Sequence, residues 1–113
     1  MSIAYKVLTA EQMAGLQREG SFAGAPIDLA DGYIHLSTAA QLTETVDKHF
    51  AGQTDLWVAA VDLDALGDAV TWEPSRGGQL FPHIYAALPV AAVIAQGPLR
   101  RDNSGQVVPP MAG

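Results

Sequence analysis

Two histidines, His35 and His83, stand in short polar segments that hold most of the side chains able to do chemistry. Residues 31–38 read Asp-Gly-Tyr-Ile-His-Leu-Ser-Thr, and residues 72–85 run from Trp-Glu-Pro-Ser-Arg-Gly-Gly to Phe-Pro-His-Ile-Tyr. Imidazole titrates near neutral pH, so proton transfer is the chemistry that these residues offer. Aromatic, titratable, Gly and Pro residues collect where a chain approaches a ligand. We therefore predict that these segments form a ligand site.

His35 is expected at the junction of a short strand and a capped helix. Side chains alternate along a strand, so Tyr33, His35 and Ser37 would share one polar face while the residues between them face the core. The first N–H groups of the following helix add partial positive charge suited to an anion. The alternative interpretation is a His35 that bonds a backbone carbonyl, with Ser37 only capping the helix.

Arg76 is a cation in a long stretch otherwise free of Lys and Arg. Arg holds carboxylate or phosphate through two parallel hydrogen bonds, and the two glycines after it could form an amide nest for an anion. The alternative is a local ion pair between Glu73 and Arg76, which contributes about 0–1 kcal/mol when exposed. We predict that Arg76 binds the ligand, with Trp72 and Glu73 at the margin of the site.

His83 begins an alternating stretch in which His83 and Tyr85 would share a face while Ile84 packs inward. Together with His35 it makes a candidate histidine pair. Two histidines and Glu73 match the ligand count of a zinc or non-haem iron site. However, the compact spacing of a His-Glu-x-x-His motif is absent from the sequence. We therefore predict no metal.

Composition limits the classes of partner. The chain has 113 residues, 49% of them hydrophobic and 16% charged, which predicts a single globular domain. It has no Cys and no apolar run of the ~20 residues that a membrane helix needs, and its first residues lead us to expect no signal peptide. A net charge of −6 argues against nucleic acid. Serine-hydrolase and dinucleotide motifs are absent. We expect a cytoplasmic monomer or homodimer with a small-molecule ligand and no membrane partner.

The elements that must position these residues are mostly strands. Helices are predicted after two capping boxes, at Thr9 and at Thr38, and one helical turn at 62–67. Loops are expected at 21–32 and 74–82. Strands are expected at residues 3–8, 33–36, 56–61, 70–73, 84–88, 90–95 and 107–108, with 56–61 as a central strand buried on both faces. Two early helices followed by strands predict an α+β fold.

The same blocks resemble a family of small bacterial proteins known as domain of unknown function 952. The family's sequence pattern looks like a series of five blocks. They are Asp-Gly-aromatic-Ile-His-Leu-Ser-Thr, Trp-Glu-Pro-Ser-Arg-Gly-Gly, Phe-Pro-His-aromatic-Tyr, Leu-Pro and a late Pro-Leu-Arg-Arg-Asp. The matching segments are residues 31–38, 72–78, 81–85, 88–89 and 98–102. The resemblance covers nearly the whole chain, and it implies no established function.

A more distant similarity is to the ADP-ribosyltransferase fold, a split-sheet α+β scaffold that binds NAD between its sheets. The similar segments are residues 5–9, 32–38 and 82–85. His35 stands at the position of that family's usual Tyr, and His83 near its usual Glu. The resemblance implies two early helices on a split, mostly antiparallel sheet, with NAD as a candidate cofactor. It also implies His35 and His83 as acid and base and Arg76 on a phosphate.

We therefore expect an α+β domain with a polar cleft that binds or processes an NAD-related or other anionic small molecule, as an ADP-ribosyltransferase-like or ADP-ribosyl-processing enzyme would. The expected catalytic residues are His35 and His83. The expected ligand-binding residues are Tyr33, Ser37, Trp72, Glu73, Arg76 and Tyr85. The alternative is a non-catalytic binding or regulatory module in which the same polar residues form a structural network.

Overall fold

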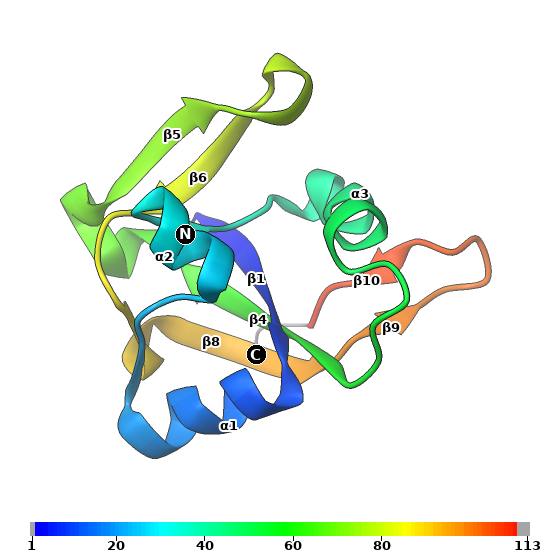
Figure 1. Ribbon diagram of the computed structural model, residues 1–113, viewed down its shortest axis with the longest axis horizontal. Helices are drawn as coiled ribbons and strands as arrows, with labels where there is room; N and C mark the ends of the chain where they lie inside the picture. The colour runs from blue at the N-terminus through cyan, green and yellow to red at the C-terminus, as the bar shows by residue number, and fades with distance from the viewer. Residues whose placement is uncertain (1, 111–113) are drawn as a thin grey trace.

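The computed structural model describes residues 2–110, apart from the side chain of Arg76. The described part is an α+β fold in which helices cover small antiparallel sheets (Figure 1). The strands are β1 (Ile3–Thr9), β2 (Ser21–Phe22), β3 (Ile34–His35), β4 (Leu56–Asp62), β5 (Val70–Pro74), β6 (Leu80–Ile84), β7 (Leu88–Pro89), β8 (Val93–Pro98), β9 (Arg100–Arg101) and β10 (Val107–Val108). The helices are α1 (Ala10–Glu19), α2 (Pro26–Asp31) and α3 (Ala39–His49), with 3-10 turns η1 (Leu63–Ala69), η2 (Arg76–Gly78) and η3 (Val90–Ala92).

The largest sheet has the order β1-β4-β8, so β4 is its central strand. This confirms the central strand predicted for residues 56–61. The apolar run in β4 is buried on both faces, as expected for a strand with a neighbour on each edge and a layer on each side. Both pairings are antiparallel, and the β1–β4 register places Thr9 opposite Leu56.

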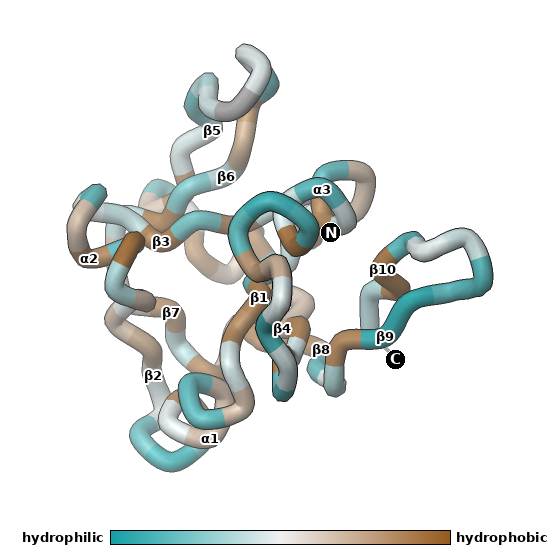
Figure 2. The backbone as a smooth tube through the Cα atoms, turned by 45° about the vertical axis from the view of Figure 1, so that its right-hand side comes forward, coloured by the Kyte–Doolittle hydropathy of each residue, from teal (hydrophilic) through white to brown (hydrophobic). Residues whose placement is uncertain are grey.

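Two hydrophobic clusters lie on opposite faces of this sheet because neighbouring β1 side chains alternate. Leu8 belongs to the larger cluster with α1, and Val7 belongs to the smaller cluster with α3. In α3, Leu42 and Val46 are fully buried, which contributes about 1.5–3 kcal/mol for each side chain. Figure 2 shows hydrophobic residues along the inner strands and hydrophilic residues at the outer turns.

The two predicted capping boxes are present and begin the two longer helices. Thr9 Oγ1 accepts the Gln12 N–H, and Thr38 Oγ1 accepts the Gln41 N–H, while each glutamine side chain accepts the N–H of its capping threonine. Each box therefore satisfies two amide groups that would otherwise lack intrahelical partners. Among residues 2–110, no helix is long and apolar enough to cross a membrane.

The loop predicted at residues 21–32 is wrong in part, because this segment contains β2 and the short helix α2. Pro26 occupies the first turn of α2, where a missing N–H costs nothing. Asp28 accepts the Ala25 N–H at 2.7 Å, and Gly32 ends the helix with φ 88°. A six-residue helix has little stability of its own, so the contacts of Asp28 described below hold it in place.

The loop predicted at 74–82 is also too long, because β6 already begins at Leu80 and is the central strand of the sheet β3-β6-β5. Proline is unusual in a central strand since it lacks an N–H. Here Pro82 uses only its carbonyl, which accepts the Leu36 N–H at 3.1 Å. The β5–β6 hairpin projects from the body of the molecule (Figure 1).

The strands predicted at 84–88 and 90–95 have different bounds in the structure. The chain leaves β6 after Ile84, forms the two-residue strand β7 beside β2, and passes through η3 before β8. Val90 donates its N–H to the Gly20 carbonyl at 2.9 Å, a tertiary hydrogen bond that interrupts the apolar run. The predicted last strand at 107–108 is confirmed.

Candidate functional site

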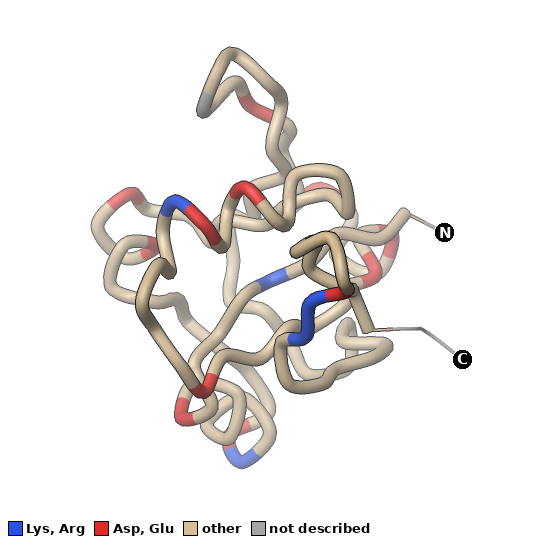
Figure 3. The backbone as a smooth tube through the Cα atoms, turned by 90° about the vertical axis from the view of Figure 1, so that its right-hand side faces the viewer, with Lys and Arg blue, Asp and Glu red and all other residues tan. Residues whose placement is uncertain are grey.

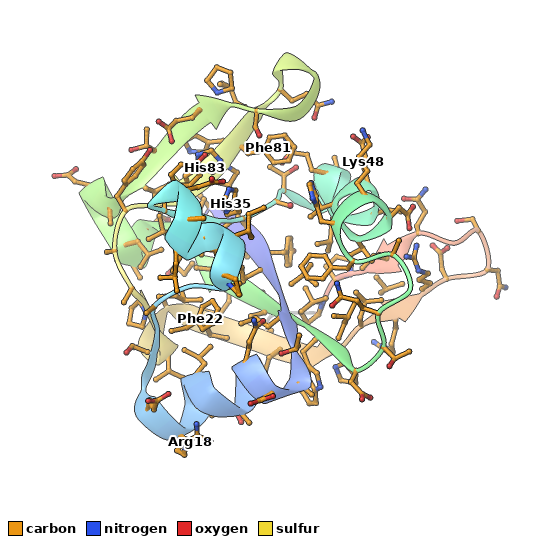
Figure 4. All side chains as sticks on the ribbon, viewed as in Figure 1. Arg18, Phe22, His35, Lys48, Phe81 and His83 are labelled. Carbon is orange, nitrogen blue, oxygen red and sulfur yellow. The ribbon has the colours of Figure 1, made fainter. Side chains whose placement is uncertain are left out.

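The pairing of β3 with β6 brings the two histidine segments together. His35 lies directly opposite His83 in this antiparallel register, and the two ring centroids are 5.4 Å apart. Ile34 and Ile84 point to the other face and are buried in the core, as the alternation predicts. Figure 4 shows His35 and His83 next to each other at the base of the β5–β6 hairpin.

Tyr33 joins the two histidines into an aromatic cluster. Its ring is stacked on His83 at 4.1 Å and lies 4.7 Å from the ring of His35. The Tyr85 ring is 5.3 Å from Tyr33. Four of the residues predicted for the site thus form one connected cluster around Tyr33, and they come from two segments that are far apart in the sequence.

His83 is bonded at one ring nitrogen and free at the other. Its Nδ1 lies 2.7 Å from Oε1 of Glu73, and the Tyr85 hydroxyl donates to the same oxygen at 2.7 Å. A carboxylate only accepts, so the proton of a neutral His83 ring is on Nδ1. Nε2 is buried and has no hydrogen-bond partner within the described residues. A carboxylate that orients a histidine in this way is the arrangement used to position a general base.

The Glu73 carboxylate changes the titration of the groups around it. Hydrogen bonds from His83 and Tyr85 lower the pKa of Glu73 from its ordinary value. The hydrogen bond from Tyr85 to Glu73, together with burial and the charge of Glu73, raises the pKa of Tyr85 to about 12. Burial and the charges of Asp31 and Glu73 also raise the pKa of Tyr33. The carboxylate therefore stays ionised and both phenols stay protonated at neutral pH.

His35, in contrast, is bonded at both ring nitrogens. Its Nδ1 lies 2.6 Å from Oδ1 of Asp28, and its Nε2 lies 2.9 Å from Oδ2 of Asp31. With both carboxylates ionised, only a ring that carries a proton on each nitrogen can donate to both. The alternative predicted for His35, a bond from the ring to a backbone carbonyl, is not what the structure shows.

A buried ion pair between Lys6 and Asp28 bonds both the carbonyl and the ring of His35. Lys6 is 5% exposed and Asp28 is 1% exposed. The Lys6 Nζ donates to both carboxylate oxygens of Asp28, at 3.1 and 2.9 Å, and to the His35 carbonyl at 3.1 Å. Burial, opposed by Asp28, lowers the pKa of Lys6. Burial acts to raise the pKa of Asp28, but the His35 hydrogen bond and the Lys6 charge together hold it well below its usual range.

Lys6 and Asp28 were missed as site residues in the sequence, although each leaves a signal. Lys6 lies between Ala4 and Leu8 on the core-facing side of β1, where a lysine requires a buried partner. Asp28 is two residues after Pro26, at the position where a carboxylate can cap a helix that begins at that proline. Their pairing across 22 residues follows from the tertiary fold.

A cavity of about 480 Å³ lies beside the histidine pair, between β1, α2, β3, α3 and β6. Its polar lining includes Lys6, Asp31, Tyr33, His35, Ser37 and His83. Its apolar lining includes Val7, Ile27, Phe50 and Phe81. Small-molecule sites have this size and this mixture of apolar walls and a few polar groups. Figure 3 shows Asp and Glu spread along the backbone and few Lys or Arg, in keeping with the net charge of −6.

The other predicted site residues have different relations to this cavity. Ser37 lines it, Glu73 contacts His83 at Nδ1, and Tyr85 donates to the same Glu73 oxygen. Trp72 is not brought to the site, because it lies on the opposite face of β5 from Glu73 and is 45% exposed. The side chain of Arg76 lies outside the described part of the structure, so its predicted contact with the ligand remains a prediction.

Two further groups bear on the site. His49, at the end of α3, lines the same cavity. Within residues 2–110, His, Asp and Glu form no group of three that is arranged to hold a metal ion. The cluster around the two histidines offers hydrogen bonding, proton transfer and aromatic contact.

Comparison with known proteins relates the chain to a family without an assigned function. The family model described as "Protein of unknown function (DUF952)" matches residues 7–96. The crystal structure of protein CC0527 from Caulobacter crescentus is similar with a TM-score of 0.86 and 40% identity, covering 95% of this chain and 94% of that one. Its solution NMR structure has a TM-score of 0.79 and 42% identity, covering 95% and 91%. A search of curated proteins gave no match. The chain belongs to the DUF952 family.

Proposed function

We propose that the chain binds a small molecule in the cavity beside the histidine pair, and that His83 accepts a hydrogen bond or a proton from it. The observation that carries this proposal is the buried Nε2 of His83, which has no partner within the described part of the chain although His83 lines the cavity. A buried polar atom without a partner costs about 1–3 kcal/mol. A ligand with a hydroxyl or amine hydrogen would recover that free energy.

In this proposal the two histidines act as base and acid. Glu73 holds the Nδ1 proton of His83 and would stabilise the imidazolium that forms when Nε2 takes a proton. His35, placed between the carboxylates of Asp28 and Asp31, would donate the proton as the acid. Glu73 determines the tautomer of a neutral His83 ring.

The proposed ligand class is an NAD-related or other anionic small molecule, with an ADP-ribosyltransferase-like fold. What supports it is the place of the three segments that resemble that fold. Tyr5, His35 and His83, one from each segment, all line the cavity. Arg76 is the proposed contact for a phosphate, because guanidinium binds phosphate oxygens in pairs.

Ligand titration followed by NMR tests the proposal. NAD, ADP-ribose and nicotinamide are added separately, and the ring nitrogens of His35 and His83 are monitored with the amides of residues 33–38 and 80–85. We expect saturable shifts in both segments with at least one ligand. His83→Gln should weaken that binding, while Glu44→Gln, a substitution in an exposed ion pair on α3 away from the cavity lining, should leave it unchanged. The absence of any shift with all three ligands would reject this ligand class.

The alternative is a non-catalytic module in which the polar residues are structural. The observation that favours it is the fully bonded network of Lys6, Asp28 and His35, which any buried charge requires irrespective of function. The stabilities of two variants separate the two functions. A structural role predicts that His35→Phe and His83→Phe both lower the free energy of unfolding. A ligand site predicts that His83→Phe leaves it unchanged or raises it.

A further inference from the structure

Ser37 is a second polar group in the cleft whose hydrogen-bonding direction is set by its neighbours. Ser37 is buried, lines the cavity, and places its Oγ 2.8 Å from Oγ1 of Thr45. Oγ1 of Thr45 donates to the Gln41 carbonyl at 3.1 Å, and a carbonyl can only accept. A hydroxyl has one proton, so Thr45 is the acceptor and Ser37 the donor in the bond between them. The remaining capacity of Ser37 Oγ is for accepting.

His83 has the same directionality for a different reason. Its Nδ1–H is held by Glu73, so Nε2 of the neutral ring is an acceptor. It is also buried and has no partner anywhere in residues 2–110. Ser37 follows β3 and His83 lies on the neighbouring strand β6, and Leu36 next to Ser37 bonds the carbonyl of Pro82 next to His83. Both residues line the same cavity, and each has the capacity to accept a further hydrogen bond.

The described cations of the cavity are already committed to other partners. Lys6 has three N–H donors, and they are matched by two Asp28 oxygens and the His35 carbonyl. Both ring nitrogens of His35 face carboxylates. Asp31 adds a negative charge to the lining. These groups disfavour an anion beside the histidine pair and favour a neutral group that donates.

We infer that the cleft recognises an uncharged ligand group with two hydrogen-bond donors, one bound by Nε2 of His83 and the other by Oγ of Ser37. A primary carboxamide and a vicinal diol both have this chemistry. The inference rests on the proposed function and specifies which end of the ligand enters the cleft. For NAD it would be the nicotinamide or ribose end, with the phosphates outside.

Matched probes test the inference on the unmodified chain. Nicotinamide is compared with methyl nicotinate, and cis-1,2-cyclopentanediol is compared with its dimethyl ether, so that each pair differs in donors and keeps its ring. Binding is followed by the ¹⁵N shift of His83 Nε2 and the amides of residues 33–38. We expect the donor probe of one pair to bind about tenfold or more tightly than its donor-free partner. The pair that responds shows whether the amide or the diol is recognised.

Two variants test whether the Ser37 hydroxyl accepts one of the two ligand donors. Ser37→Ala should weaken the binding of the donor probe about tenfold and leave the binding of the donor-free probe unchanged. Thr45→Val removes the acceptor of the Ser37 proton, so the hydroxyl becomes free to donate and the preference for donor probes should narrow. Thr43→Val makes the same substitution on α3 at a residue bonded to β10 and should keep the preference.

The outcomes separate this inference from the proposed function. Equal binding of donor and donor-free probes, with shifts in the cleft, would overturn the two-donor inference and leave the small-molecule site standing. A lack of response to every probe would overturn both. Because the probe comparison uses the wild-type chain, a variant that fails to fold does not affect the result.

Discussion

The two histidines lie opposite each other on neighbouring strands, but their surroundings differ in how completely they are bonded. His35 has a carboxylate at each ring nitrogen and a buried lysine beneath it. His83 has a carboxylate at one nitrogen, and the other is unpartnered within the described residues. A protein does not usually leave a buried polar atom unpaired without a reason. Within the described structure, the His35 side of the site is thus fully bonded, while the His83 side keeps one buried hydrogen-bond acceptor.

The largest effect should come from breaking the ion pair on the His35 side. Asp28→Asn leaves the buried charge of Lys6 without its partner and should lower the free energy of unfolding by about 3–5 kcal/mol. Urea denaturation measures it. Asp47→Asn breaks an exposed ion pair with Arg101 and should cost about 0–1 kcal/mol, which makes it the matched control. Equal losses for the two variants would contradict a supporting role for Asp28.

Replacing each histidine by phenylalanine sharpens the comparison directly. His35→Phe removes the ring that bonds buried Asp28 and should cost about 1–3 kcal/mol. His83→Phe removes an unpaired polar atom, keeps a ring stacked on Tyr33, and should change stability by less than about 1 kcal/mol. Thermal and urea denaturation of both variants are compared with the wild type. A larger loss for His83→Phe would show that the two halves have been assigned the wrong way round.

The pH dependence of stability gives a third test of the His35 side. The pKa of Asp28 is lowered in the folded state from an ordinary value of 3.8. A carboxyl with a depressed pKa stabilises the fold above its unfolded pKa, and this contribution is lost as pH falls through the folded pKa. We expect the free energy of unfolding to fall between about pH 5 and pH 2, and Asp28→Asn to flatten this part of the curve. Unfolding by urea at several pH values measures it.

Local patterns in the sequence predicted the elements whose stability is mainly local. The two threonine capping boxes and the buried apolar run of β4 both appear in the structure. Alternation also predicted that Tyr33 and His35 share a face, as do His83 and Tyr85. Each of these features depends on side chains within a few residues of one another.

Features that depend on distant partners could not be predicted in the same way. The helix α2 is held by the bonds of Asp28 to Lys6 and His35, and the polar half of the site that they form appears only when β1, α2 and β3 meet. β6 tolerates Pro82 because its carbonyl is the group that the ladder needs. Trp72 was predicted at the margin of the site because it adjoins Glu73 in the sequence. Neighbouring residues of a strand point to opposite faces, so Trp72 lies on the other face of β5.

The smallest expected effect concerns the second phenol on the His83 side. Tyr85 and His83 donate to the same oxygen of Glu73 and together lower its pKa. Tyr85→Phe removes one donor, so the pKa of Glu73 should rise toward its ordinary value while the bond to His83 keeps it depressed. A ¹³C NMR titration of the Glu73 carboxyl measures the change, with Tyr5→Phe as the control. An unchanged pKa of Glu73 would show that the Tyr85 hydroxyl does not stabilise the ionised carboxylate. The tautomer of His83, with Nε2 as the acceptor, would then be set by Glu73 without help from Tyr85.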